Sequence, residues 1–128
     1  MNKDNFSPGI KRRAIEDKII AHFYDVNFDQ KKHRWLEDKV FWDFVFSWFE
    51  LVKYYERSKD TAIGANMLDL YAACVSRFQE AARDRNIRER RRDKAADAMY
   101  QINYYMNQLM IEVERNGHHW DDQYGTIT

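Results

Sequence analysis

Apolar positions recur along this chain at the three-to-four-residue spacing of α-helices, and four separate stretches show the pattern. The densest stretch, residues 40–55, reads VFWDFVFSWFELVKYY, in which twelve of the sixteen residues are large and apolar. Its polar residues Asp43, Ser47 and Glu50 step by four and three, so a helix carries them on one narrow stripe and is apolar around most of its circumference. Such a helix must be surrounded by others. The pattern therefore predicts an all-α, four-helix bundle-like domain with this long aromatic-rich helix at its centre.

Capping residues divide the chain into its predicted helices. Pro8 suits a first helical position, and Asp29 can cap the central helix. Asn86 with Glu89 has the spacing of a capping box, and Gly117 can end the last helix in the left-handed conformation. The predicted helices span about 8–25, 30–57, 61–84 and 87–116, followed by a tail or docking segment over 117–128. Residues 81–92 contain good helix formers throughout, so a continuous third and fourth helix is the alternative at that boundary.

Composition narrows the class of protein further. A chain of 128 residues fits one domain, taken as 1–128, and its 16% aromatic content is too high for a disordered chain. Cys74 is the only cysteine, which excludes an internal disulfide and favours a reducing compartment. The chain shows neither a secretion signal nor an uninterrupted apolar run long enough for a bilayer, so we expect a cytoplasmic protein. It has no Gly-rich phosphate loop, and we expect no cofactor.

Formal net charge is zero, but residues 83–94, RDRNIRERRRDK, carry seven cations and three anions. Cations in the first turns of a helix face the positive end of its dipole, at a cost on the order of 0.3–1 kcal/mol each, and a bound anion would relieve this cost. Arginine donates paired hydrogen bonds to phosphate and carboxylate, so the cluster is a candidate site for a nucleic-acid backbone or an acidic protein face. The alternative is a solvated face with i,i+4 ion pairs. The candidate residues are Arg83, Arg85, Arg88, Arg90, Arg91, Arg92 and Lys94.

The aromatic residues of the central helix have two interpretations. Aromatics at helical spacing usually fill a core, which is the simpler interpretation. However, Trp42, Phe46 and Phe49 lie partly off the main apolar seam, and only three other helices are available to cover them. Exposed aromatic patches mark partner sites, so these three residues form a candidate interface, either for another protein or for a homodimer.

Acidic residues also suggest a catalytic alternative, because small all-α nucleotide pyrophosphohydrolases hold magnesium with carboxylates from two facing helices. Asp43, Glu50 and Glu56 on the central helix, with Asp93 and Asp97 on the last one, are the candidates here. That enzyme class uses E-E-x-x-E and a later E-x-x-D, whereas this chain has D-x-x-x-x-x-x-E and D-x-x-x-D. The match is generic, and a solvent-facing or inter-helix acidic stripe is the favoured interpretation.

Histidine and cysteine give little support for a metal or nucleophile. No H-E-x-x-H or E-x-x-H motif occurs, and adjacent His118 and His119 are expected to point in different directions, so we expect no metal site there with Asp121 and Asp122. His22 is predicted to be a hydrogen-bonded core histidine. Cys74 lies among small and apolar residues without a nearby histidine, so we interpret it as a packing residue.

These observations favour a non-catalytic, protein-binding helical module: a regulator, an inhibitor or a small subunit of a larger assembly. Compact proteins without motifs are common in phages and mobile elements, which adds a prior from size alone. RNA or DNA binding through the basic cluster is the second hypothesis, and the magnesium-dependent hydrolase is the third.

Overall fold

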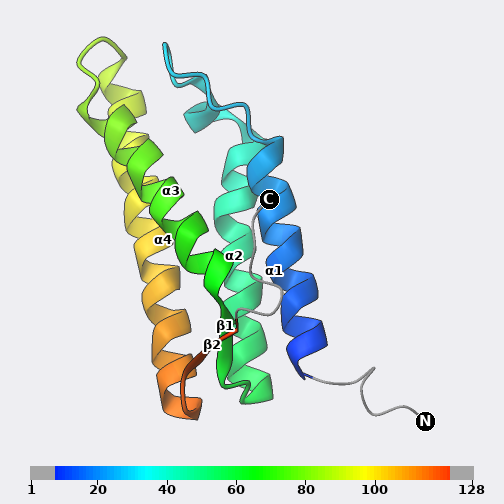
Figure 1. Ribbon diagram of the computed structural model, residues 1–128. Coiled ribbons are helices and arrows are strands. Elements are labelled where there is room, and N and C mark those ends of the chain that lie inside the picture. Colours follow the sequence, from blue (N-terminus) through cyan, green and yellow to red (C-terminus); the bar gives the residue numbers. More distant parts are fainter. Residues whose placement is uncertain (1–7, 122–128) are drawn as a thin grey trace.

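The computed structural model describes residues 8–121 and shows a helical protein with one pair of very short strands (Figure 1). The predicted all-α class is confirmed. The elements are α1 (Pro8–Asp25), the 3₁₀ helix η2 (Arg34–Glu37), α2 (Lys39–Ser58), β1 (Ala62–Gly64), α3 (Ala65–Arg83), α4 (Glu89–Asn116) and β2 (His119–Asp121).

Consecutive helices run antiparallel, with α1 beside α2 and α4 packed against both α2 and α3 (Figure 1). The α1–α2 and α3–α4 connections lie at one end of the bundle. The strands and the first turns of α1 lie toward the other end. β1 and β2 pair in parallel, with Ile63 opposite Trp120. None of the helices within residues 8–121 combines the length and apolar character that a membrane span requires.

Helix α2 supplies the centre of the core, as its sequence predicted. Phe41, Phe44 and Trp48 are fully buried, and the Phe41 ring meets Phe78 of α3 edge-on at 5.4 Å between centroids. The buried residues of α2 are Phe41, Phe44, Val45, Trp48, Leu51, Val52, Tyr54 and Tyr55. The exposed residues Asp43 and Glu50 lie on the expected polar stripe. Close packing of this many rings fixes α2 against all of its neighbours.

The predicted start of the central helix at residue 30 was wrong, because α2 begins at Lys39. Asp29 does accept backbone N–H groups of Lys31 and Lys32, but it caps only a turn. His33 then takes a left-handed conformation (φ 51°, ψ 46°), which a helix cannot continue through. Asp38 is the actual N-cap, and its side chain accepts the N–H of Val40.

Two further helix starts differ from the prediction. Helix α3 begins at Ala65 rather than residue 61, because residues 62–64 form β1. Helix α4 begins at Glu89 and its N-cap is Arg88, whereas Asn86 instead donates its backbone N–H to Asp84 in a turn. This turn separates α3 from α4, so the continuous-helix alternative is wrong.

The end of α4 follows the predicted C-cap. Gly117 has φ 104°, the left-handed conformation that glycine adopts without steric cost. The first part of the predicted tail docks as β2, and residues 122–128, with Asp122, lie outside the described range.

Candidate functional site

The arginine-rich cluster lies at the end of the bundle formed by the two inter-helix connections. It covers the last residue of α3, the α3–α4 connection and the first turns of α4. The irregular α1–α2 connection adds Lys31, Lys32 and Arg34, which line cavities at this same end. We call these residues, together with the seven predicted cations, the basic end. Sequence reasoning missed the three additions because it placed them within a helix.

One predicted site residue has an internal role. The Arg91 guanidinium donates to Glu37 at 3.1–3.2 Å and to the Lys32 carbonyl oxygen at 2.9 Å, and its side chain is only 13% exposed. Its hydrogen bond to Glu37 lowers the pKa of that carboxyl. Buried His33 adds a contact, with its Nε2 3.3 Å from an Asp84 carboxylate oxygen. These contacts fasten the two connections to each other.

A cavity of about 270 Å³ opens between the fastened connections. Its lining contains four cations and no carboxylate: Lys32, Arg34, Asn86, Ile87, Arg88 and Arg91. A second cavity of about 540 Å³ shares Lys32 and Arg34 but is also lined by Asp29 and Asp38. The smaller cavity is therefore the more cationic of the two. We call it the arginine cavity.

The predicted aromatic interface is partly exposed. Phe46 and Phe49 keep 53% and 43% of their surface in solvent. Phe49 leans on Tyr105 of α4, with ring centroids 5.9 Å apart, and the neighbouring Tyr104 is 48% exposed. Trp42 differs, because it packs against the core and its indole N–H donates to the Leu36 carbonyl oxygen at 2.6 Å. We call Phe46, Phe49 and Tyr104 the aromatic face.

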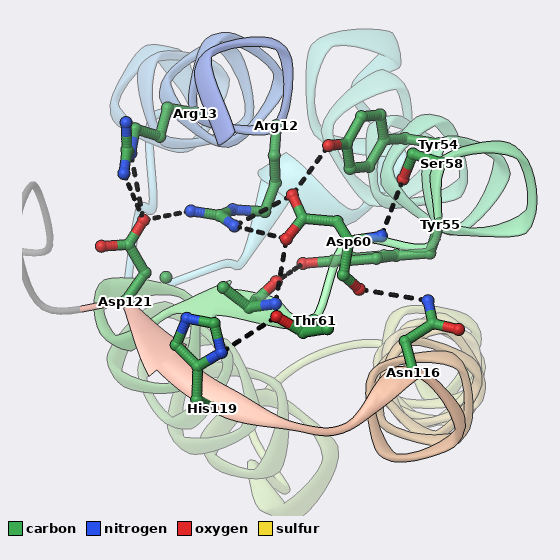
Figure 2. A network of polar contacts seen from close by, with 12 residues as sticks. Arg12, Arg13, Tyr54, Tyr55, Ser58, Asp60, Thr61, Asn116, His119 and Asp121 are labelled. Carbon is green, nitrogen blue, oxygen red and sulfur yellow. Dashed lines mark hydrogen bonds and ion pairs between the residues drawn. The ribbon is translucent and has the colours of Figure 1, made fainter. Parts of the chain in front are cut away.

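A buried ionic network lies at the opposite end of the bundle from the basic end (Figures 1 and 2). Its centre is Arg12 of α1, which is 1% exposed. Nη1 donates to both carboxylate oxygens of Asp60 at 3.0 Å, Nη2 donates to Asp121, and Nε lies 3.5 Å from Glu16. Arg13 also contacts Asp121, at 2.9–3.0 Å. The network thus joins α1 to β2 through Asp121, and to the segment just before β1 through Asp60.

Polar groups around the network add further hydrogen bonds to it (Figure 2). Asp60 accepts the Tyr54 hydroxyl at 2.7 Å and the Ala62 N–H at 2.9 Å. The Tyr55 hydroxyl donates to the Ala62 carbonyl oxygen at 2.6 Å, and the Asn116 amide donates to the Asp60 carbonyl oxygen at 3.1 Å. Residues from α1, α2, α4 and both strands contribute to the network. Because these elements are far apart in the sequence, no local motif predicted it.

Burial and charge shift the pKa values of this network in opposing ways. Burial raises the pKa of Glu16 and outweighs both the Gly64 N–H that it accepts at 2.8 Å and the Arg12 charge. For Arg12, burial favours the neutral form, but the surrounding carboxylates outweigh it and raise the pKa. Burial also raises the pKa values of Tyr54 and Tyr55. Arg12 therefore stays charged and holds the network together.

The carboxylates of the hydrolase alternative do not form a cluster. Asp43, Glu50 and Glu56 are exposed and pair with lysines: Lys39 at 2.6 Å, Lys18 at 3.1 Å and Lys53 at 3.4 Å respectively. Asp93 and Asp97 are exposed on α4. Among residues 8–121, no group of three or more His, Cys, Asp or Glu side chains is arranged to hold a metal ion.

Histidine and cysteine side chains have separate surroundings. His118 Nδ1 lies 2.7 Å from Glu114, and His119 Nδ1 lies 3.0 Å from the Thr61 hydroxyl, so the two rings have different partners as expected. His22 is only partly buried, less than a core histidine would be. Cys74 is fully buried, and burial raises the pKa of its thiol, as suits a packing residue.

Comparison with protein-family models, curated proteins and solved structures finds no match for this chain. The indications of its function therefore come from the aromatic face and the basic end.

Proposed function

We propose that this protein is a non-catalytic binding module that docks another protein on the aromatic face. The observation that carries the proposal is the exposure of Phe46 and Phe49 on a helix whose other rings are nearly all buried. Burying apolar surface contributes roughly 25 cal/mol per Å², and aromatic residues are enriched in protein interfaces. A partner that covers these two rings would gain the free energy of burying apolar surface that stays exposed to solvent in the folded protein.

The surroundings of the aromatic face match the usual layout of an interface, with an apolar centre and a polar rim. Phe49 packs on Tyr105, and Lys53 of the next turn lies 5.0 Å from the centroid of the Phe49 ring. Glu50 and Lys18 form an exposed ion pair beside it. The centre suits a complementary apolar patch on the partner, and the rim supplies charges that orient it.

Affinity capture from the native host tests the proposal. The bait is the full chain, and the double variant Phe46→Ala/Phe49→Ala is compared with wild type by mass spectrometry. Tyr24→Ala provides the matched control, because Tyr24 is also an exposed aromatic but lies on α1. We expect the double variant to lose the captured protein at an unchanged melting temperature, whereas the control retains it. Equal capture by all three baits would refute the proposal.

Self-association is the competing use of the same face. Sedimentation of the purified chain over a range of concentrations separates the two cases. A monomer at all concentrations supports docking of a different protein. A dimer that dissociates in the double variant instead assigns the face to a second copy.

A further inference from the structure

The arginine cavity is formed by residues other than those of the aromatic face. Its cations come from two segments far apart in sequence: Lys32 and Arg34 from the α1–α2 connection, and Arg88 and Arg91 from the start of α4. Such a convergence of like charges raises the energy of the folded protein. A bound anion would reverse this cost.

Within residues 8–121, carboxylates neutralise these charges only in part. Glu37 pairs with Arg91 at 3.1 Å and lies 3.9 Å from Arg90. Within residues 8–121, neither Lys32, Arg34 nor Arg88 forms an ion pair with a carboxylate. Among the described residues, the lining therefore keeps Lys32 and Arg88 without a close carboxylate, beside the fixed Arg91 guanidinium. Backbone hydrogen bonds and the charge of Arg34 lower the pKa of nearby Asp29, so Arg34 is compensated in part.

The cavity walls are held in place without a ligand. Arg91 is fixed by Glu37 and by the Lys32 carbonyl oxygen, and buried His33 meets Asp84 across the two connections. Binding at such a site does not have to order the backbone of the two connections, which removes one part of the entropic cost of binding. The volume, about 270 Å³, is just below the usual range for drug-sized ligands and suits a small anion.

The start of α4 lies at the cavity, because its N-cap residue Arg88 is part of the lining. Arg88 provides no side-chain acceptor, and the helix that follows is 28 residues long. Its first N–H groups and its dipole favour a negative charge at the position where Ser, Thr, Asp or Asn would ordinarily cap it.

We propose that the arginine cavity binds a single terminal phosphate group. Paired guanidinium donors match phosphate oxygens, and a phosphate dianion meets the charge of the lining cations better than a carboxylate does. The group can come as free phosphate or as the phosphate end of a small phosphorylated molecule.

Titration of the full-length protein with inorganic phosphate tests this assignment, with sodium chloride at matched ionic strength as the reference. Backbone amide resonances of Glu89 and Arg90 are expected to shift most, with saturation. Arg34→Gln/Arg88→Gln should weaken phosphate binding at least tenfold. Arg83→Gln/Arg85→Gln removes the same charge from the basic end outside the cavity lining and should leave binding within about twofold.

Three results would overturn the assignment. The first is no shift beyond that seen with chloride. The second is equal weakening in both double variants, which would indicate diffuse charge rather than a site. The third is tight binding of a single-stranded oligonucleotide without terminal phosphates that inorganic phosphate does not displace, which would assign the basic end to a nucleic-acid backbone.

A nucleoside 5′-monophosphate distinguishes the two sources of the group. Affinity equal to that of inorganic phosphate supports recognition of the phosphate alone. Affinity at least tenfold higher, lost in Arg34→Gln/Arg88→Gln, supports a small phosphorylated molecule that also contacts the adjoining 540 Å³ cavity.

Discussion

At the scale of single residues, Arg12 has the most restrictive surroundings, because it is a charged side chain that is only 1% exposed. A buried charge is tolerated only when it is paired and hydrogen-bonded, and Arg12 pairs with Asp60, Asp121 and Glu16 through all three nitrogen atoms of its guanidinium. Nothing near Arg12 in sequence indicated this role, because two of its three partners lie 48 and 109 positions away. The spacing of residue types along the chain indicates local structure, and it does not reveal ion pairs between residues so far apart in sequence.

Removing the central charge should therefore destabilise the protein strongly. Arg12→Met leaves the carboxylates of Asp60 and Glu16 buried without their cation, and we expect a loss of about 3–5 kcal/mol in the free energy of unfolding. Urea denaturation measures it. Lys11→Met, an exposed cation on the same helix, is the control and should change stability by less than about 0.5 kcal/mol. A loss below about 1 kcal/mol for Arg12→Met would show that the network contributes little.

Glu16 gives the network a defined pH dependence. Its pKa in the folded protein lies above the ordinary value of 4.5, so the folded state holds this proton more tightly than the unfolded state does. The stabilisation from the protonated form is complete below pH 4.5 and is lost as pH rises through the folded pKa. Wild type should thus lose stability relative to Glu16→Gln as pH increases from about 4.5, and then level off. If the stability of wild type relative to Glu16→Gln stayed flat as pH increased, or rose, the raised pKa would be contradicted.

At the scale of elements, helix existence was predictable and helix starts were less so. The 3.6-residue periodicity identified the four α-helices that the structure describes between residues 8 and 121, and Gly117 marked the end of α4. Residues 30–38 did not form the first turns of the central helix as predicted. Trp35 and Leu36 are buried in the 3₁₀ helix η2. His33 has a left-handed backbone conformation, which would end any α-helix that ran into η2. Strand β1 was also missed, because three residues that pair with a segment 57 positions away carry no periodic signal.

Strand β1 depends on a glycine for close packing rather than for backbone freedom. A Cβ on Gly64 would lie 2.7 Å from Asn66 Oδ1 and 2.8 Å from Glu16 Oε1, both on buried side chains. Gly64→Ala should therefore cost about 1–3 kcal/mol of stability through overpacking. Gly9→Ala in α1, where the nearest atoms are 3.6 Å away, is the control and should leave stability unchanged or raise it. Thermal unfolding of both variants checks this, and equal melting temperatures would refute the steric argument.

At the scale of the whole molecule, the two ends and one side of the bundle differ in their chemistry. The ionic network closes one end around the strands, the basic end gathers cations around the arginine cavity, and the aromatic face lies along α2 and α4. The sequence identified the arginine cluster and two of the exposed rings. It could not show that Arg91 is used internally or that Lys32 and Arg34 join the cavity, because both depend on how separate connections pack.

Solvent accessibility of the single thiol reports on the integrity of this arrangement. Cys74 of α3 is fully buried in the core, and burial raises the pKa of its thiol, so the thiolate is scarce in the folded protein. We expect a thiol reagent to modify native protein at least a hundredfold more slowly than protein in denaturant. Comparable rates in both conditions would show that the bundle opens readily around α3.

The central claim is that Phe46 and Phe49 form a docking surface for another protein. Hydroxyl-radical footprinting of the chain, alone and bound to its captured partner, tests it most directly. The account predicts that oxidation of Phe46 and Phe49 falls several-fold in the complex, while Tyr24, exposed on α1, is oxidised at the same rate in both states. Undiminished oxidation of Phe46 and Phe49 in the complex would contradict it.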